Sequence, residues 1–205
     1  RRNDGTERSF TAAEVSDGTL EAWVLAPVSS LIGNRMYFDG VDDRVNITPI
    51  TFTGDFSIKF TYLNQDFFNS SAIGGPLSSV GQNVSTSFRI ITDVSSVLNV
   101  TLLSGSIPLN TLTTIYFKRV NGKFGVYDEN EVLITNEVAN AENWTMQYIG
   151  RGRLSGGLKH KGLISDVNVN GTAAYQGYGN TNADWLDTIG SNHGTFTGLP
   201  ELFTG

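Results

Sequence analysis

The feature that most constrains the fold of this chain is a two-residue period of apolar side chains. In the segment DFSIKFTYL, residues 55–63, one set of positions is apolar and the other is polar: Phe56, Ile58, Phe60 and Tyr62 alternate with Ser57, Lys59 and Thr61. A strand points successive side chains to opposite faces of a sheet. The pattern is therefore typical of an antiparallel strand with one buried and one solvated face.

The same alternation returns several times along the chain, with turn residues between the segments. SFRIIT at 87–92 and VLNVTLL at 97–103 repeat it, and TTIYFKRV at 113–120 and KGLISDVNVNG at 161–171 are further expected strands. Asn121-Gly122 predicts a tight hairpin, because both central residues of that turn need a positive φ. Short strands separated by turn residues predict an all-β fold, an antiparallel two-sheet jelly-roll sandwich.

Three regions are expected from the change of pattern along the chain. Residues 1–34 lack the two-residue period and predict an N-terminal arm or linker, with a capping-box spacing in TAAE at 11–14. Residues 35–171 predict the sandwich itself. Residues 172–205 are rich in Gly, Asn, Thr and aromatic residues. We expect them to form an ordered extension, packed on the sandwich or on a neighbouring molecule.

Composition argues against several classes of partner and site. The chain has 14 basic and 20 acidic residues, a net charge of −6, which disfavours a nucleic-acid partner. It has no cysteine, so thiolate zinc sites and thiol nucleophiles are excluded. No segment approaches the roughly 20 apolar residues of a membrane span, so no membrane partner is expected. The chain starts at Arg1 rather than Met, and we expect it to be a piece of a longer polypeptide.

The order of the segments resembles a known superfamily. RMYFDGVDDRVNI at 35–47, DFSIKFTYL at 55–63, YFKRVNGKFGVYDENEVLI at 116–134 and YIGRGRLSGGLKHKGLISDVNVNG at 148–171 are arranged as in concanavalin A-like jelly rolls of the laminin-G-like type. The flanks RRNDGTERSFTAAEVSDGTLEAWV at 1–24 and ADWLDTIGSNHGTFTG at 183–198 resemble segments that flank such domains in bacteriophage fibre, tail or capsid-decorating proteins. The resemblance implies a virion surface protein.

The acidic stretch FDGVDD at 38–43 has two interpretations. In laminin-G-like domains this stretch is a hairpin, in which Asp39-Gly40 supplies the positive φ and Asp42 or Asp43 accepts backbone amides. The alternative is calcium, which takes six or more oxygen ligands. Asp39, Asp42 and Asp43 would supply some of these ligands, with Asp166 if the late strand lies alongside. Calcium is the one cofactor we consider.

Catalytic machinery is not expected. Glycosidases of the same superfamily carry two glutamates flanking an aspartate on one strand, whereas Glu129 and Glu131 here have Asn130 between them, at an expected hairpin tip. His160 stands between two lysines and His193 in a glycine-flanked turn, so a histidine zinc triad is not available. We expect the protein not to be an enzyme.

Aromatic residues near the end of the chain suggest a glycan site. Sugar rings stack on aromatic faces, and polar side chains take their hydroxyls. The candidates are Tyr175, Tyr178, Asn182, Asp184 and Trp185, with Arg151 and Arg153 for an acidic glycan. The alternative is that the aromatic rings only pin the extension onto the sandwich.

These expectations combine into two functions. The first is a non-enzymatic virion structural, decoration or fibre protein of a bacteriophage, self-associating or bound to other virion proteins, and displaying a lectin-like domain on the virion surface. The second is a carbohydrate-binding or adhesion module of a secreted bacterial protein.

Overall fold

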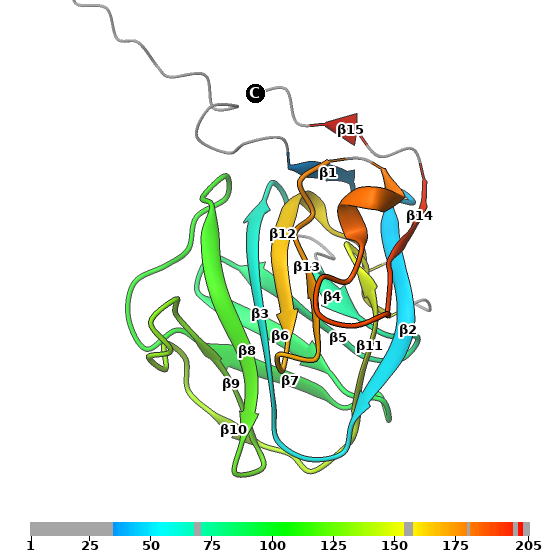
Figure 1. Ribbon diagram of the computed structural model, residues 1–205. Coiled ribbons are helices and arrows are strands. Elements are labelled where there is room, and N and C mark those ends of the chain that lie inside the picture. Colours follow the sequence, from blue (N-terminus) through cyan, green and yellow to red (C-terminus); the bar gives the residue numbers. More distant parts are fainter. Residues whose placement is uncertain (1–34, 68–70, 154–157, 180, 199–200, 203–205) are drawn as a thin grey trace, which may run out of the picture.

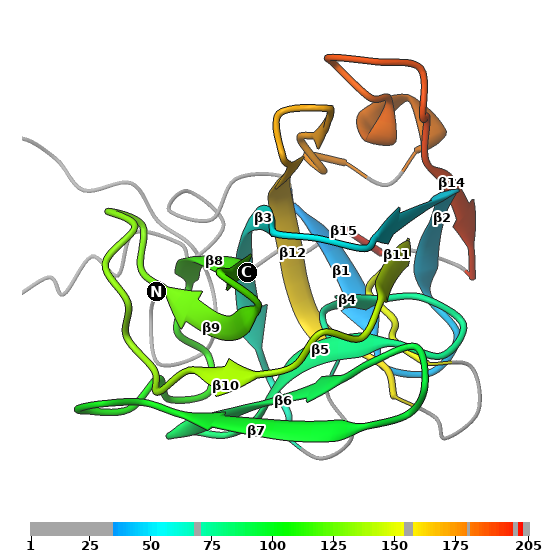
Figure 2. The same ribbon diagram turned by 90° about the horizontal axis from the view of Figure 1, so that it is seen from below.

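The predicted all-β sandwich is confirmed by the computed structural model, which describes residues 35–67, 71–153, 158–179, 181–198 and 201–202. Two antiparallel sheets stack face to face, and Figure 2 shows them as two layers (Figures 1 and 2). The expected N-terminal arm, residues 1–34, lies outside the described residues.

One layer, here called the front sheet, faces the viewer in Figure 1. Its strand order is β10-β9-β8-β3-β12-β1-β15, and β13 pairs with β12 beside β1. The bounds are β1 Met36–Asp39, β3 Phe56–Asn64, β8 Thr113–Val120, β9 Lys123–Tyr127, β10 Val138–Ala139, β12 Lys161–Val169, β13 Ala173–Tyr175 and β15 Glu201–Leu202.

The second layer, the back sheet, has the order β14-β2-β11-β4-β5-β6-β7. Its strands are β2 Arg44–Phe52, β4 Ile73–Gly74, β5 Ser79–Val84, β6 Ser87–Ile91, β7 Val97–Thr101, β11 Trp144–Ile149 and β14 Thr195–Thr197. One short 3-10 helix, η1 (Asn182–Trp185), precedes β14. Among the described residues, no helix is both long enough and apolar enough to span a membrane.

The core lies between the layers, and the alternation of β3 fills it as predicted. Phe56, Ile58, Phe60 and Tyr62 are all buried in one apolar cluster. Further aromatic rings from both sheets pack around Phe56, which stacks on Phe52 with ring centroids 4.4 Å apart and on Trp144 at 5.7 Å. On the opposite face of β3, Ser57 and Lys59 are half-buried and Thr61 is buried, and these residues form part of the site described below.

Strand β12 changes phase in its middle. Its pairing with β3 runs from Ser165 opposite Thr61 to Asn168 opposite Lys59. That is three steps along β12 against two along β3, so β12 carries one extra residue, a β-bulge. Asp166 has a φ of 53° in this bulge. The bulge lets both halves of β12 keep apolar side chains inward, since Ile164 precedes it and Val167 and Val169 follow it in the core.

The acidic stretch at 38–43 is not the hairpin that the resemblance implied. Strand β1 pairs with β12 and β15 in the front sheet, whereas β2 pairs with β11 and β14 in the back sheet. The stretch therefore carries the chain from one layer to the other. The expected positive φ is present at Gly40, at 79°.

Both hairpin tips predicted around β9 are confirmed. Asn121 and Gly122 have φ values of 50° and 72° between the paired strands β8 and β9. Asp128 shapes the second tip, because its side chain accepts the amides of Asn130 and Val132.

The segment after Gly171 contributes strands to both sheets. β13 pairs with β12 in the front sheet, and β14 pairs with β2 in the back sheet. Trp185 of η1 is fully buried in the core cluster, with its ring against Phe38 and Phe196. The described part of this segment is therefore integral to the sandwich.

A buried arginine joins the layers at the end of the sandwich away from the acidic turn. Arg119 follows Ile115 and Phe117 on the inner face of β8 and is 2% exposed. Its guanidinium donates to the carbonyls of Gly54, Phe52 and Glu142. Burial lowers the pKa of Arg119 from its usual value, yet a guanidinium stays charged at any ordinary pH. It also lies 5.5 Å from the Phe56 ring centroid.

We expect Arg119→Met to lower the free energy of unfolding by about 3 kcal/mol, because it leaves three carbonyls without their donor and each such loss costs about 1–3 kcal/mol. Urea denaturation followed by tryptophan fluorescence measures this. Arg89→Met is the matched control. Arg89 is half-buried on the outer side of β6, and its substitution is expected to change stability by less than about 0.5 kcal/mol. Equal losses in the two variants would contradict the role given to Arg119.

Candidate functional site

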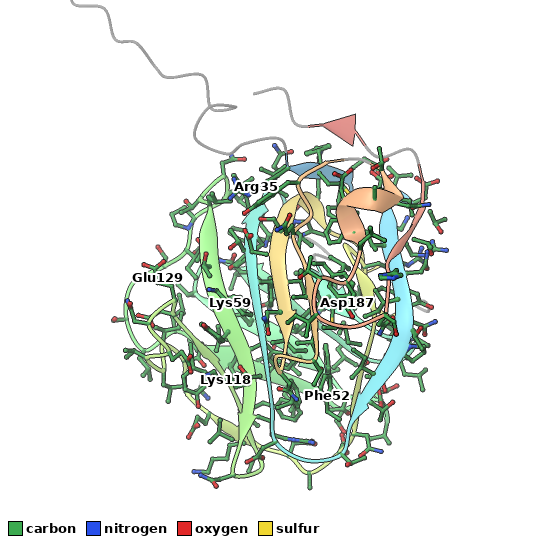
Figure 3. All side chains as sticks on the ribbon, viewed as in Figure 1. Arg35, Phe52, Lys59, Lys118, Glu129 and Asp187 are labelled. Atoms are coloured by element: carbon green, nitrogen blue, oxygen red, sulfur yellow. The ribbon has the colours of Figure 1, made fainter. Side chains whose placement is uncertain are left out.

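The outer face of the front sheet carries a polar groove. Three adjoining cavities of about 540, 460 and 220 Å³ share Lys59 as a lining residue. The first two are within the size range of ligand sites in proteins. Figure 3 shows Arg35, Lys59 and Lys118 over this face, with Glu129 at its outer margin (Figure 3). Other lining residues are Ser57, Thr61, Thr114, Tyr116, Asp166, Asn168 and Asn170.

Lys59 owes its place at the centre to strand register. It lies opposite Tyr116 of β8 on one side and Asn168 of β12 on the other. Its ammonium is 5.6 Å from the centroid of the Tyr116 ring, within the range of a cation–π contact. Lys59 forms no ion pair with a carboxylate of the described residues.

A second lysine, Lys118, packs against aromatic rings of β8 and β9 beside the groove. The ammonium of Lys118 lies 4.8 Å from the centroid of Tyr116 and 4.9 Å from that of Tyr127. It also forms an ion pair with Glu131 at 2.5 Å. Burial, with a hydrogen bond to Glu137, raises the pKa of Tyr127. The Tyr116 ring thus has the ammonium groups of both Lys59 and Lys118 near it, the Tyr127 ring has that of Lys118, and the charge of Lys118 is paired with Glu131.

Asp166, placed on the outer face by the bulge, anchors the other end of the groove. Its carboxylate accepts from the hydroxyls of Tyr178, at 2.5 Å, and Ser165, at 2.8 Å. Arg35 donates to Ser165 and pairs with Asp166 at 3.9 Å. The hydrogen bond to Asp166, with burial, raises the pKa of Tyr178. Arg35 and Asp166, the charged groups at this end, therefore neutralise each other.

The predicted calcium set is brought together only in part. Asp39, Asp42 and Asp43 have ligand atoms within 4.8 Å of one another. Asp166 is wrong as a fourth ligand. In the β1–β12 ladder Asp39 pairs with Lys161 at one end, and Asp166 belongs to the groove network near Arg35 at the other.

Backbone amides of the acidic turn bind two of its carboxylate oxygens. Asp39 Oδ1 accepts the amides of Val41 and Asp42, and Asp43 Oδ2 accepts the amide of Asp39. Asp43 is 4% exposed, and its Oδ1 is buried without a hydrogen bond. Burial, and then the charges of Asp39 and Asp42, raise the pKa of Asp43, although the amide bond from Asp39 opposes this. Calcium would need at least six oxygens, so carbonyls and water would have to complete a site here.

The predicted glycan residues do not form one surface. Tyr175 and Trp185 are 1% and 0% exposed, so neither offers an open ring face on which a sugar could stack. Asn182 accepts the amide of Phe196, and Asp184 accepts from Thr181, so both shape the loop around η1. Tyr178, 45% exposed, reaches the groove through its hydrogen bond to Asp166, and Tyr175 is among the residues that line the cavity of about 220 Å³.

The two arginines of GRGR lie elsewhere. Arg151 forms a β-bridge with Lys159 near the ends of β11 and β12, and neither Arg151 nor Arg153 lines any of the three cavities above.

The glutamates and histidines that could act as acids or bases are either exposed in a turn or engaged in contacts that hold the fold. Glu129 is exposed in the β9 tip, and Glu131 pairs with Lys118, so the two do not share a strand face as a glycosidase pair would. His193 accepts the amide of Asp187 in the loop after η1. His160 is fully buried beside Phe38, and burial lowers its pKa to about 4, while hydrogen bonding to the Leu163 and Leu63 backbone opposes this.

The groove residues were missed at the sequence level, although one signal was present. The polar positions of β3, Ser57, Lys59 and Thr61, were assigned to the solvated face, which is where the groove lies. No pattern in the sequence shows that β8 and β12 flank β3, because their pairing joins segments far apart in the chain.

Comparison with known proteins supports the fold and leaves the function open. No family model matches the chain, and no curated protein matches it by sequence. Among solved structures, the native heptameric SAP-like pentraxin from Limulus polyphemus superposes with a TM-score of 0.53. The match has 12% identity and covers 82% of this chain and 93% of the pentraxin chain. The two proteins share the jelly-roll sandwich fold of lectin-like domains.

Acid should destabilise the protein through His160. The folded-state pKa is about 4, against about 6.5 in an unfolded chain. The unfolded chain therefore binds the extra proton first as the pH falls through this window. We expect a loss of up to about 3 kcal/mol between pH 6.5 and 4. His160→Gln should show a flatter pH dependence in urea unfolding, and identical slopes would contradict the assignment.

The acidic turn predicts the opposite pH dependence. A carboxyl whose folded pKa is raised costs stability as the pH rises above the pKa of its unfolded form, near 4. Without divalent cations, we expect the Tm of Asp43→Asn to improve relative to the wild type between pH 4 and pH 7. A constant difference across this range would show that Asp43 ionises freely.

Calcium titration distinguishes the two interpretations of the turn. A calcium site requires that calcium raise the Tm of the wild type at pH 7 and leave Asp43→Asn unchanged. A turn with only a geometric role gives the same small response in both.

Proposed function

We propose that this chain is a non-catalytic, lectin-like display module that binds glycans in the groove of the front sheet. The observation that carries the proposal is that three adjoining cavities share Lys59 as a lining residue, with the aromatic ring of Tyr116 in the wall of one of them. Sugars are held by this combination of hydrogen-bonding side chains and an aromatic face. The rigid sheets below the groove fix its side chains before any ligand arrives.

The proposed setting is the surface of a bacteriophage particle, as a decoration or fibre protein. Its support is the resemblance of the flanking segments 1–24 and 183–198 to those around such domains in phage structural proteins. Other virion proteins, or further copies of this chain, are the proposed partners. A closed homo-oligomer is the usual arrangement for such modules, and the pentraxin that shares the fold is heptameric.

Absence of catalysis is part of the proposal. Its support is that Asp166 accepts hydrogen bonds from two hydroxyls and pairs with Arg35, while Glu131 pairs with Lys118. A general acid needs a carboxyl group with access to the scissile bond. A carboxylate stabilised by a cation and two donors is suited to orienting side chains.

A glycan array with the purified chain tests the binding function, with Tyr116 as the probe position. We expect Tyr116→Ala to weaken binding of array-selected glycans roughly tenfold, since the aromatic wall is lost, about 1.4 kcal/mol. Tyr116→Phe keeps the ring and should stay within about threefold of the wild type. Binding that is absent from the whole array, or indifferent to Tyr116→Ala, would refute the groove as the site.

The setting is tested separately by mass spectrometry of purified phage particles and by immunogold labelling of intact virions. Detection on the particle surface is expected. Recovery of the chain only as a secreted bacterial protein would replace the virion setting with the adhesion-module alternative.

A further inference from the structure

One positive charge in the groove, that of Lys59, has no carboxylate partner among the described residues. Arg35 pairs with Asp166, and Lys118 pairs with Glu131. Lys59 lies between these two pairs on β3, and its ammonium is 5.6 Å from the centroid of the Tyr116 ring. Among the cations lining the three cavities, Lys59 is therefore the one without an ionic partner in the described residues.

The cavity of about 460 Å³, here called the middle cavity because it is the second of the three in volume, contains this unbalanced charge. Its lining has no Asp or Glu: it consists of Ser57, Lys59, Tyr116, Asn168, Asn170 and Gly171. The Glu129 and Asp166 carboxylates line the neighbouring cavity instead. A ligand group in the middle cavity thus meets one positive charge and no negative one.

The two asparagines in this cavity are oriented by the backbone. Asn170 Oδ1 accepts the amide of Ser57 at 2.5 Å, and Asn168 Oδ1 accepts the amide of Gly171 at 3.0 Å. A backbone N–H can only donate, so the oxygen of each side-chain amide must face it. The remaining group of each side chain is the NH₂, which is a donor. Lys59, Asn168 and Asn170 therefore offer donors to the cavity.

A positive charge surrounded by donors is complementary to a carboxylate. An ionised carboxylate accepts hydrogen bonds through two oxygens, and its bonds to charged donors are the stronger class. A neutral sugar hydroxyl uses both donor and acceptor capacity, and the side-chain hydroxyls that could accept from it in this lining are those of Ser57 and Tyr116. The Tyr116 ring can then lie against the apolar face of the same sugar ring.

We propose that the middle cavity selects glycans with a carboxylate-bearing sugar, and that Lys59, Asn168 and Asn170 bind this carboxylate. This inference rests on the proposed glycan-binding function and names its ligand class. The net charge of −6 does not prevent it, because charges beyond about 10 Å are largely screened at moderate salt.

Paired probes that differ only in the acid group or acidic residue test the selectivity. We would measure affinity by calorimetry for oligogalacturonate against its methyl ester, and for sialyllactose against lactose. The two pairs separate a uronic acid from a sialic acid as the source of the carboxylate. We expect at least one acidic member to bind roughly tenfold or more tightly than its neutral counterpart.

Substitutions at Lys59 connect the preference to this residue. Lys59→Gln should reduce affinity for the preferred acidic member roughly tenfold and leave affinity for the neutral member within about threefold. Lys59→Arg keeps the charge and should retain the preference. Lys161→Gln is the matched control, since Lys161 is exposed on β12 and lines none of the three cavities. Thermal unfolding of each variant verifies folding.

The outcomes separate the inference from the function on which it rests. Binding of acidic and neutral members with equal affinity, or a preference that survives Lys59→Gln, would overturn the carboxylate assignment and leave glycan binding intact. Binding of no glycan on the array, with neither pair bound, would overturn both.

Discussion

Two sheets can stack only if every strand keeps its apolar side chains on the inner face, and β12 meets this constraint with one extra residue. The bulge between Ser165 and Asn168 shifts the phase of the strand, so that Ile164 before it and Val167 after it both point inward. Asp166 is left on the outer face, beside Arg35 and Tyr178. The packing requirement of the core thereby determines which polar groups line the groove.

The layers are joined by buried groups of very different character. At one end, Arg119 spans from β8 to the carbonyls of Phe52, Gly54 and Glu142. At the same end the ring of Trp144 stacks near Phe52 and Phe56, and at the other end the ring of Trp185 packs against Phe38 between the sheets. Because these contacts hold both sheets in fixed positions, the groove residues on β3, β8 and β12 are held on a rigid surface. Ordered binding sites gain affinity from such support, since little freedom is lost when a ligand binds.

The strands and turns were largely predictable because their causes are local. The alternation in 55–63 reflects strand geometry alone, and Asn121-Gly122 reflects the positive φ that its turn requires. Predictions failed where the structure depends on contacts between residues far apart in the sequence. The stretch 38–43 was taken for a hairpin, yet its two strands pair with β12 and β11, far away in the sequence. Trp185 was a candidate sugar platform, but the loop around η1 folds its ring into the core.

The local pattern of residues is enough to predict antiparallel strands with one apolar and one polar face, and to place Lys59 on the polar face. Alternation along a strand is a property of neighbouring residues, so it can be read without the fold. Three features depend instead on how distant strands pair: Lys59 stands between Tyr116 and Asn168, Asp166 joins Arg35 rather than the acidic turn, and Tyr175 and Trp185 are buried. These outcomes depend on which strands pair and in which register, and that choice is made by the burial of the whole core.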